Sequence, residues 1–177
     1  NGALPISADG KESVFGITSY DFIAGGTGSG NVNRAYTVSL LDGLKNVGIV
    51  ADAQLQQVYA DYKVKCDAER AEAAKKENMM MSFLPQPLPA EILPTDAQLK
   101  AAVETNDVAI ITLGRISGEF LDRTVDNFNL STEEQQLIAS VTRAFKSAGK
   151  KTVVVLNIGG VIETASWKNT PDAVLLA

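Results

Sequence analysis

The stretch from Asp107 to Arg123, DVAIITLGRISGEFLDR, constrains the fold of this chain more than any other. It begins with a short run, Val108 to Leu113, that is rich in β-branched residues and apolar on both faces. Such a run is typical of an interior strand of a parallel sheet. It stops at Gly114 and passes into a polar loop, which we expect at the carboxyl edge of the sheet, where α/β proteins bind ligands.

Further strand and helix signals alternate along the chain. Apolar runs predict strands at residues 13–18, 153–158 and 173–177, and helical spacing predicts helices at 35–47, 52–76 and 96–103. Ser131 and Glu134 form a Ser-x-x-Glu capping box that begins another helix, which ends at Gly149. This alternation predicts an α/β fold, a three-layer sandwich with a mostly parallel sheet.

Composition bounds the domain count and the chemistry. With 177 residues and 45% hydrophobic content, the chain is expected to form one domain over residues 1–177. The net charge of −5 offers no basic face, so we predict no nucleic-acid partner. No apolar run approaches the roughly 20 residues that span a bilayer, so no membrane contact is predicted. Histidine is absent and Cys66 is the only cysteine, so the commonest zinc ligand is missing, no thiolate metal cluster is possible, and no metal site is predicted.

Two irregular segments stand out between these elements. Residues 78–94 contain three methionines and four prolines and predict a loop excursion. A loop of this length raises the question of a function, although an insertion packed on the body is the more ordinary interpretation. Gly25 to Gly30 contains four glycines in GGTGSG, which is consistent with a phosphate cradle but lacks the Lys-Ser/Thr ending of a P-loop. A tight turn required by packing is the more ordinary interpretation of such a segment.

Glu119, in the polar loop, is the first candidate catalytic residue. General acid/base chemistry needs a carboxyl group whose pKa burial can raise, and glycoside cleavage needs a second carboxylate about 5 to 9 Å away. Sequence spacing does not identify that partner. Glu163 also follows a strand end and is the runner-up, although a helix-start carboxylate is its ordinary interpretation. Arg115, Asp122 and Arg123 are expected to bind sugar or to brace the loop as an Asp–Arg pair, and bracing is favoured.

Four groups of residues together resemble the second domain of family 3 glycoside hydrolases, the β-glucosidases and their relatives. The resemblance covers nearly the whole chain, and the matching segments occur in the expected order. They are Gly25–Val32 (GGTGSGNV), Asp107–Ile111 with Ser117–Arg123 (SGE-x-x-DR), Leu130–Ser131 with Gln136–Ile138, and Val153–Glu163 (VVVLNIGGVIE).

The resemblance implies a role for several residues. In this family a (β/α)₈ barrel supplies an aspartate nucleophile, and the α/β sandwich supplies the acid/base glutamate, which falls on Glu119. Gly28 and Ser29 are then expected to bind the substrate at the rim of the sugar pocket. Phe120 replaces a glycine found in many relatives and is expected to line the site of the leaving group. No cofactor is implied, and the substrate is expected to be a β-linked glucoside or oligosaccharide.

The resemblance also implies that the active site is shared with another domain. The family's nucleophile segment has no counterpart in this sequence, and Asn1 to Asp9 carries neither a start methionine nor a helix or strand signal. We therefore expect a domain cut from a larger multidomain chain, with the barrel in the same polypeptide. The alternatives are a non-catalytic scaffold or sugar-binding module and, from the glycine loop, a phosphate- or nucleotide-binding domain.

Overall fold

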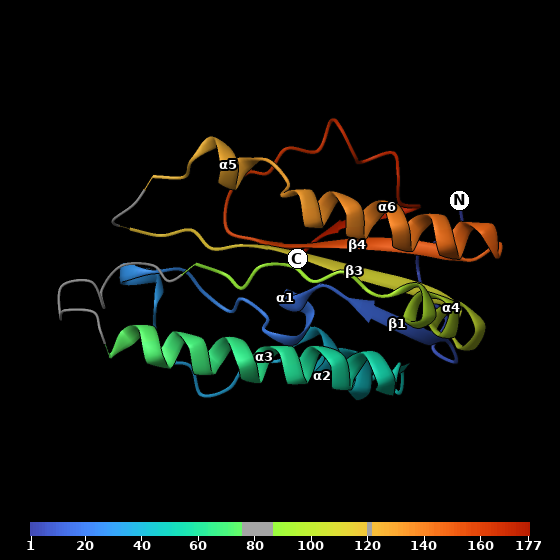
Figure 1. Ribbon diagram of the computed structural model, residues 1–177, viewed down its shortest axis with the longest axis horizontal. Coiled ribbons are helices and arrows are strands. Elements are labelled where there is room, and N and C mark those ends of the chain that lie inside the picture. Colours follow the sequence, from blue (N-terminus) through green and yellow to red (C-terminus); the bar gives the residue numbers. More distant parts are fainter. Residues whose placement is uncertain (76–86, 120–121) are drawn as a thin grey trace.

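A computed structural model describes residues 1–75, 87–119 and 122–177 (Figure 1). Its sheet has the strand order β2-β1-β3-β4-β5, and every neighbouring pair is parallel. The predicted α/β sandwich is therefore confirmed, with a sheet that is parallel throughout its described strands. Phe120 and residues 78–86 of the predicted loop excursion lie outside the described residues. Residues 87–94 contain neither helix nor strand.

The elements follow one another in the order that the sequence predicts, with some additions. The strands are β1 (Lys11–Phe15), β2 (Val50–Ala51), β3 (Val108–Arg115), β4 (Lys151–Ile158) and β5 (Ala173–Leu176). The helices are α1 (Ile17–Tyr20), the 3₁₀ turn η1 (Gly28–Gly30), α2 (Leu40–Asn46), α3 (Ala53–Ala74), α4 (Asp96–Thr105), α5 (Val125–Phe128) and α6 (Thr132–Ser147). Among the described residues, no helix is long and apolar enough to cross a membrane.

Two apolar clusters, one on each face, hold the sheet between its helices. Alternate residues of β3 point to opposite faces, as the two-residue period of a strand requires. Ile111 joins the cluster formed with α4 and α6, and Ile110 joins the cluster formed with α2. α6 and α2 accordingly lie on opposite sides of the sheet in Figure 1. Both faces of β3 are buried, which explains its continuous apolar sequence.

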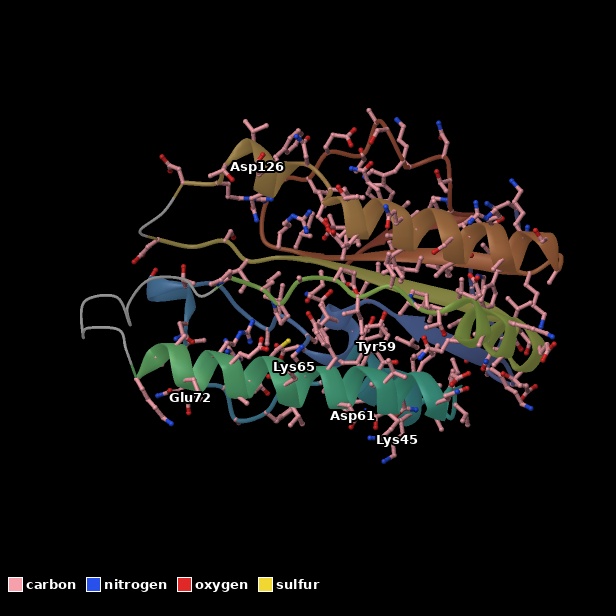
Figure 2. All side chains as sticks on the ribbon, in the orientation of Figure 1. Lys45, Tyr59, Asp61, Lys65, Glu72 and Asp126 are labelled. Carbon is pink, nitrogen blue, oxygen red and sulfur yellow. The ribbon has the colours of Figure 1, made fainter. Side chains whose placement is uncertain are left out.

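α3 is fixed to the sheet by a tyrosine. Tyr59 points toward the strands, whereas Asp61 of α3 and Lys45 of α2 point away from them (Figure 2). The Tyr59 hydroxyl accepts a hydrogen bond from the backbone N–H of Gly16 at 3.0 Å. Gly16 ends β1 with φ +90°, a conformation that favours glycine.

Three predicted boundaries were wrong, each because a local signal was misjudged. The first strand ends at Phe15, since Gly16 turns the chain and Ile17 begins a helical turn. The helix predicted at 35–47 begins only at Leu40, where Ser39 and Asp42 form a capping box. Residues 31–38 are all exposed instead. Thr95, not Asp96, caps α4.

The connections between strands create a crevice at the carboxyl edge of the sheet. β1 and β3 are neighbours, but the chain leaves β1 toward α2 on one face and leaves β3 toward α6 on the other. A topological switch point of this kind is where open α/β sheets bind ligands. The loop that follows β3 carries Glu119 at this edge.

Glu12 in β1 gives the fold a pH dependence. Its side chain is buried, and both carboxyl oxygens lack a hydrogen-bond partner among the described residues. Burial, and secondarily the charge of Asp107, raises the pKa of Glu12 from 4.5 to about 7. Between these pH values the folded state binds more protons than the unfolded state, so the free energy of unfolding falls as the pH rises.

Glu12→Gln should remove this pH dependence. The variant cannot ionise, so we expect it to gain about 2 kcal/mol over the wild type on going from pH 5 to pH 8. Chemical denaturation of both proteins across this range measures the difference. If the free energies of unfolding of the two proteins differ by the same amount at every pH from 5 to 8, Glu12 keeps an ordinary pKa in the folded protein.

Candidate active site

The glycine segment and the loop after β3 lie against each other. The backbone N–H of Thr27 donates to the carbonyl oxygen of Ser117 at 3.1 Å, and Thr27 pairs with Gly118 in an isolated parallel bridge. The Thr27 hydroxyl also donates to the carbonyl oxygen of Glu119 at 3.3 Å. Two segments about ninety residues apart in the sequence thereby form one rim at the carboxyl edge of the sheet.

Ser29 holds the side chain of Glu119 through both carboxyl oxygens. Its hydroxyl donates to Oε1 at 2.5 Å, and its backbone N–H donates to Oε2 at 3.3 Å. Gly28, with φ +63°, allows this approach, because a Cβ at that position would lie only 2.8 Å from the Cβ of Glu119. The structure therefore brings together three of the predicted site residues: Gly28, Ser29 and Glu119.

The carboxyl group of Glu119 is exposed, contrary to the partial burial expected from the sequence. The hydrogen bonds from the Ser29 hydroxyl and then from the Ser29 backbone N–H lower its pKa, because they stabilise the carboxylate. Within the described residues, Glu119 is therefore held as a carboxylate. Proton donation at neutral pH requires a further surface that covers it and raises its pKa.

Arg115 lies at the end of β3 and is buried, although the sequence suggested a loop position. Its guanidinium makes a bidentate ion pair with Glu134, at 2.6 Å and 2.8 Å. It also donates to the carbonyl oxygens of Asn127 at 2.6 Å and Asn129 at 2.9 Å. Arg115 thus ties the chain between α5 and α6 to the central strand.

Arg123 and Asp122 do not form the expected Asp–Arg pair. Arg123 donates from Nε to Oδ1 of Asn127 at 2.7 Å and from Nη2 to its carbonyl oxygen at 3.1 Å. Asp122 is exposed and forms no ion pair with Arg115 or Arg123, all three being described residues. The bracing partners are Glu134 and Asn127, because both lie on the α5–α6 segment that packs over the end of β3.

Asn157 is a site residue that the sequence reasoning missed. Its side-chain Oδ1 accepts from the backbone N–H of Ile23 at 2.7 Å, and its Nδ2 donates to the Ile23 carbonyl at 3.0 Å. These bonds tie the chain before the glycine segment to β4. The signal was a lone amide in the apolar run of residues 153–158. Asn157 also lines a pocket of about 460 Å³ together with Gly25, Gly26 and Ser117.

Glu163 belongs to a different arrangement. Its two carboxyl oxygens accept from the backbone N–H of Ser166 at 2.8 Å and from the Ser166 hydroxyl at 2.6 Å. These bonds lower its pKa and begin the turn at 165–169, so the carboxyl group starts a turn and not the helix of its ordinary interpretation. Glu163 forms no hydrogen bond with Ser29 or Glu119, all three being described residues, and its backbone N–H donates to the carbonyl oxygen of Phe128 at 2.9 Å.

The glycine segment is poorly suited to bind a phosphate. Its Ser29 N–H, which a phosphate would need, is used by the Glu119 carboxylate, and that negative charge opposes an anionic ligand. The phosphate hypothesis is therefore not supported by the geometry. Among the described residues, no three acidic or cysteine side chains gather as metal ligands.

Comparisons with known proteins agree with one another. Residues 1–177 match the sequence profile described as the glycosyl hydrolase family 3 C-terminal domain. A β-glucosidase from Ruminococcus albus is 31% identical over 99% of this chain, which spans 18% of that relative. The structure of β-glucosidase 3B from Thermotoga neapolitana in complex with glucose superposes with a TM-score of 0.84 and 36% identity, covering 98% of this chain and 24% of that one. A Paenibacillus barengoltzii β-glucosidase gives a TM-score of 0.81 at 31% identity over 99% of this chain and 19% of its own.

Proposed function

Because the chain belongs to glycoside hydrolase family 3, we propose that it supplies the general acid/base of a retaining, exo-acting β-glucosidase. The residue in that role is Glu119. The observation that carries the proposal is its place at the carboxyl edge of the sheet, with its exposed carboxyl group held by Ser29. The Thermotoga neapolitana relative binds glucose, and we extend a β-linked glucoside substrate to the rim of this chain.

The proposed reaction has two steps and needs only two carboxyl groups. In the first, the protonated Glu119 gives its proton to the glycosidic oxygen while an aspartate of the barrel domain attacks the anomeric carbon. The bond to the leaving group breaks with its electron pair on that oxygen. In the second, the Glu119 carboxylate takes a proton from water, and the resulting hydroxide releases the sugar from the aspartate.

The proposal requires a second domain over Glu119. A retaining pair of carboxyl groups lies about 5 to 5.5 Å apart, and the hydrogen bonds to the Glu119 carboxyl group among the described residues come from Ser29 alone. A covering surface would also remove water from Glu119 and raise its pKa toward the range an acid needs. We assign both contributions to a (β/α)₈ barrel of the same polypeptide.

Exposed apolar side chains beside the glycine segment support that placement. Val32, Tyr36 and Val38 are 58%, 80% and 48% exposed, in a segment that lacks helix and strand. Exposed apolar groups next to a site that lacks part of its catalytic residues are typical of a surface that another domain covers. The barrel is therefore proposed to rest on residues 31–38 as well as on the loop after β3.

The test compares two glutamates in the full-length enzyme. Glu119→Gln cannot donate or accept the catalytic proton, so its hydrolysis of a β-linked disaccharide should fall by roughly 10²–10⁴-fold. Glu163→Gln is the matched control, since Glu163 is also held by a serine, and it should stay within about threefold of the wild type. The opposite ranking of the two variants would move the acid/base role to Glu163.

The rival proposal is a sugar-binding module without catalysis, which the exposure and low pKa of Glu119 favour. Such a module should bind sugar without the barrel. Calorimetric titration of the 177-residue chain with glucose and with a β-linked disaccharide distinguishes the two. We expect no binding by the chain alone, and millimolar or tighter binding would support the module.

A further inference from the structure

We propose that Ser29 is a positioning residue, whose hydroxyl and backbone N–H together clamp the carboxyl group of Glu119 instead of contacting the sugar. This inference rests on the proposed function. It replaces the expectation, drawn from the resemblance, that Ser29 binds substrate. The clamp is a fork: one residue offers two donors, and each carboxyl oxygen accepts one of them.

Three backbone hydrogen bonds hold the segment around Ser29 in place. The Gly30 N–H donates to the Thr27 carbonyl at 3.2 Å, and the Asn31 N–H donates to the Gly28 carbonyl at 3.0 Å, which closes the turn around Ser29. Thr27 is bonded to Ser117 on the neighbouring loop. The two donors of Ser29 are therefore preorganised relative to the loop that carries Glu119, and this kind of support fixes a catalytic geometry.

Geometry also argues against a donor role toward the sugar. A serine hydroxyl has one proton, and in Ser29 that proton lies in the 2.5 Å bond to Glu119 Oε1. A sugar hydroxyl that accepted it would have to break the bond to the carboxylate. While Glu119 is a carboxylate, the charge-assisted bond is the stronger of the two, so the hydroxyl remains with Glu119.

The clamp acts on the proton-transfer step. When the carboxyl group of Glu119 gives its proton to the glycosidic oxygen, the carboxylate that forms gains both hydrogen bonds of Ser29 at full strength. The donors thus stabilise the product of proton transfer and oppose reprotonation. Removing the hydroxyl should raise the pKa of Glu119, because the hydrogen bond from Ser29 is the main cause that lowers it.

Ser29, and not a charged group near the site, lowers the pKa of Glu119. Asp122 and Arg123 follow Glu119 on its own loop, and Arg34, which follows the glycine segment, lies beside Gly25. Among the described residues, the pKa of Glu119 responds only to the two Ser29 hydrogen bonds and to desolvation. A covering domain would change how far desolvation raises the pKa of Glu119. The lowering of that pKa by the two hydrogen bonds would still depend on Ser29.

The test is the pH profile of kcat/KM for the full-length enzyme and its Ser29→Ala variant on a β-linked disaccharide, whose leaving group needs the proton of the acid. The basic limb of the profile reports the acid in the free enzyme, so it should move to higher pH in Ser29→Ala. The loosened carboxyl group should also lower kcat by roughly 10- to 100-fold with KM nearly unchanged. Ser29→Thr keeps the hydroxyl and should restore both quantities toward the wild type.

Ser166→Ala is the matched control, because Ser166 clamps Glu163 with the same pair of donors. Its basic limb should stay where the wild type has it. A Ser29→Ala variant with a raised KM and an unmoved basic limb would make Ser29 a sugar ligand and overturn the inference. If Glu119→Ala behaves as an acid/base variant while that limb stays fixed, only the inference about Ser29 fails. If Glu119→Ala retains activity, the proposed function fails and the inference fails with it.

Discussion

Full-length enzyme carrying Glu119→Ala is expected to cleave glucosides with poor leaving groups roughly 10²–10⁴-fold more slowly than the wild type. An alkyl or sugar alkoxide cannot leave without a proton, and Glu119 is the proposed donor. An aryl glucoside with a good leaving group departs unprotonated, so its first step should be almost as fast as in the wild type. Hydrolysis then stalls at the second step, because no base activates water. A rapid burst of aryl alcohol followed by slow turnover is the expected trace.

The neighbouring acid on the same loop provides the control for this prediction. Asp122 is exposed and is not paired with Arg115 or Arg123, so Asp122→Asn removes a charge from the loop without removing a described contact. Its rates on both substrates should stay within about threefold of the wild type. Equal slowing of both substrates in Glu119→Ala, without a burst, would indicate loop damage and not the loss of an acid.

Arg115→Met should destabilise the domain more than any change at the rim. The substitution leaves the Glu134 carboxylate, whose side chain is only 12% exposed, without its cation. Breaking one partner of a buried pair costs about 3–5 kcal/mol, because the remaining charge stays desolvated. The carbonyl oxygens of Asn127 and Asn129 lose their donors as well. Denaturant unfolding measures the loss of stability.

Two comparison variants make the result specific. Glu134→Gln retains a side chain that suits the capping box with Ser131 but removes the charge, so its cost should be smaller than that of Arg115→Met. Lys63→Met breaks pairs with Asp21 and Asp67 in which the Lys63 side chain is 35% exposed, and should cost at most about 1 kcal/mol. If Arg115→Met and Lys63→Met cost the same, the Arg115–Glu134 pair does not brace the loop.

The sequence predicted the fold well because its strands are buried on both faces. The apolar runs at 108–113 and 153–158 are too short for helices, and the structure places them at the centre of the parallel sheet. The capping box of Ser131 and Glu134 was equally informative, as the helix predicted from Ser131 begins at Thr132. Signals that depend on tertiary packing were not visible. β2 has only two residues, and its pairing with β1 cannot be inferred from so short a run.

The site was only partly predictable for the same physical reason. Glu119, Gly28 and Ser29 were named, but their mutual contact depends on a bridge between segments about ninety residues apart. Arg115 was assigned to the loop because a charged residue is unusual in a buried strand. Its burial depends on the ion pair with Glu134, which lies on another element and cannot be inferred from the sequence near Arg115. The exposure of Glu119 could not be inferred from its apolar neighbours, since a loop beyond a strand end need not be covered by its own domain.

Azide rescue of Glu119→Ala in the full-length enzyme tests the central claim most directly. Azide is a nucleophile that needs no general base, and alanine leaves room for it beside the sugar, so it should release the stalled intermediate. We predict that azide accelerates turnover of the aryl glucoside and that NMR identifies β-glucosyl azide as the product. Unchanged turnover, with glucose as the only sugar product, would contradict the assignment of Glu119 as the acid/base.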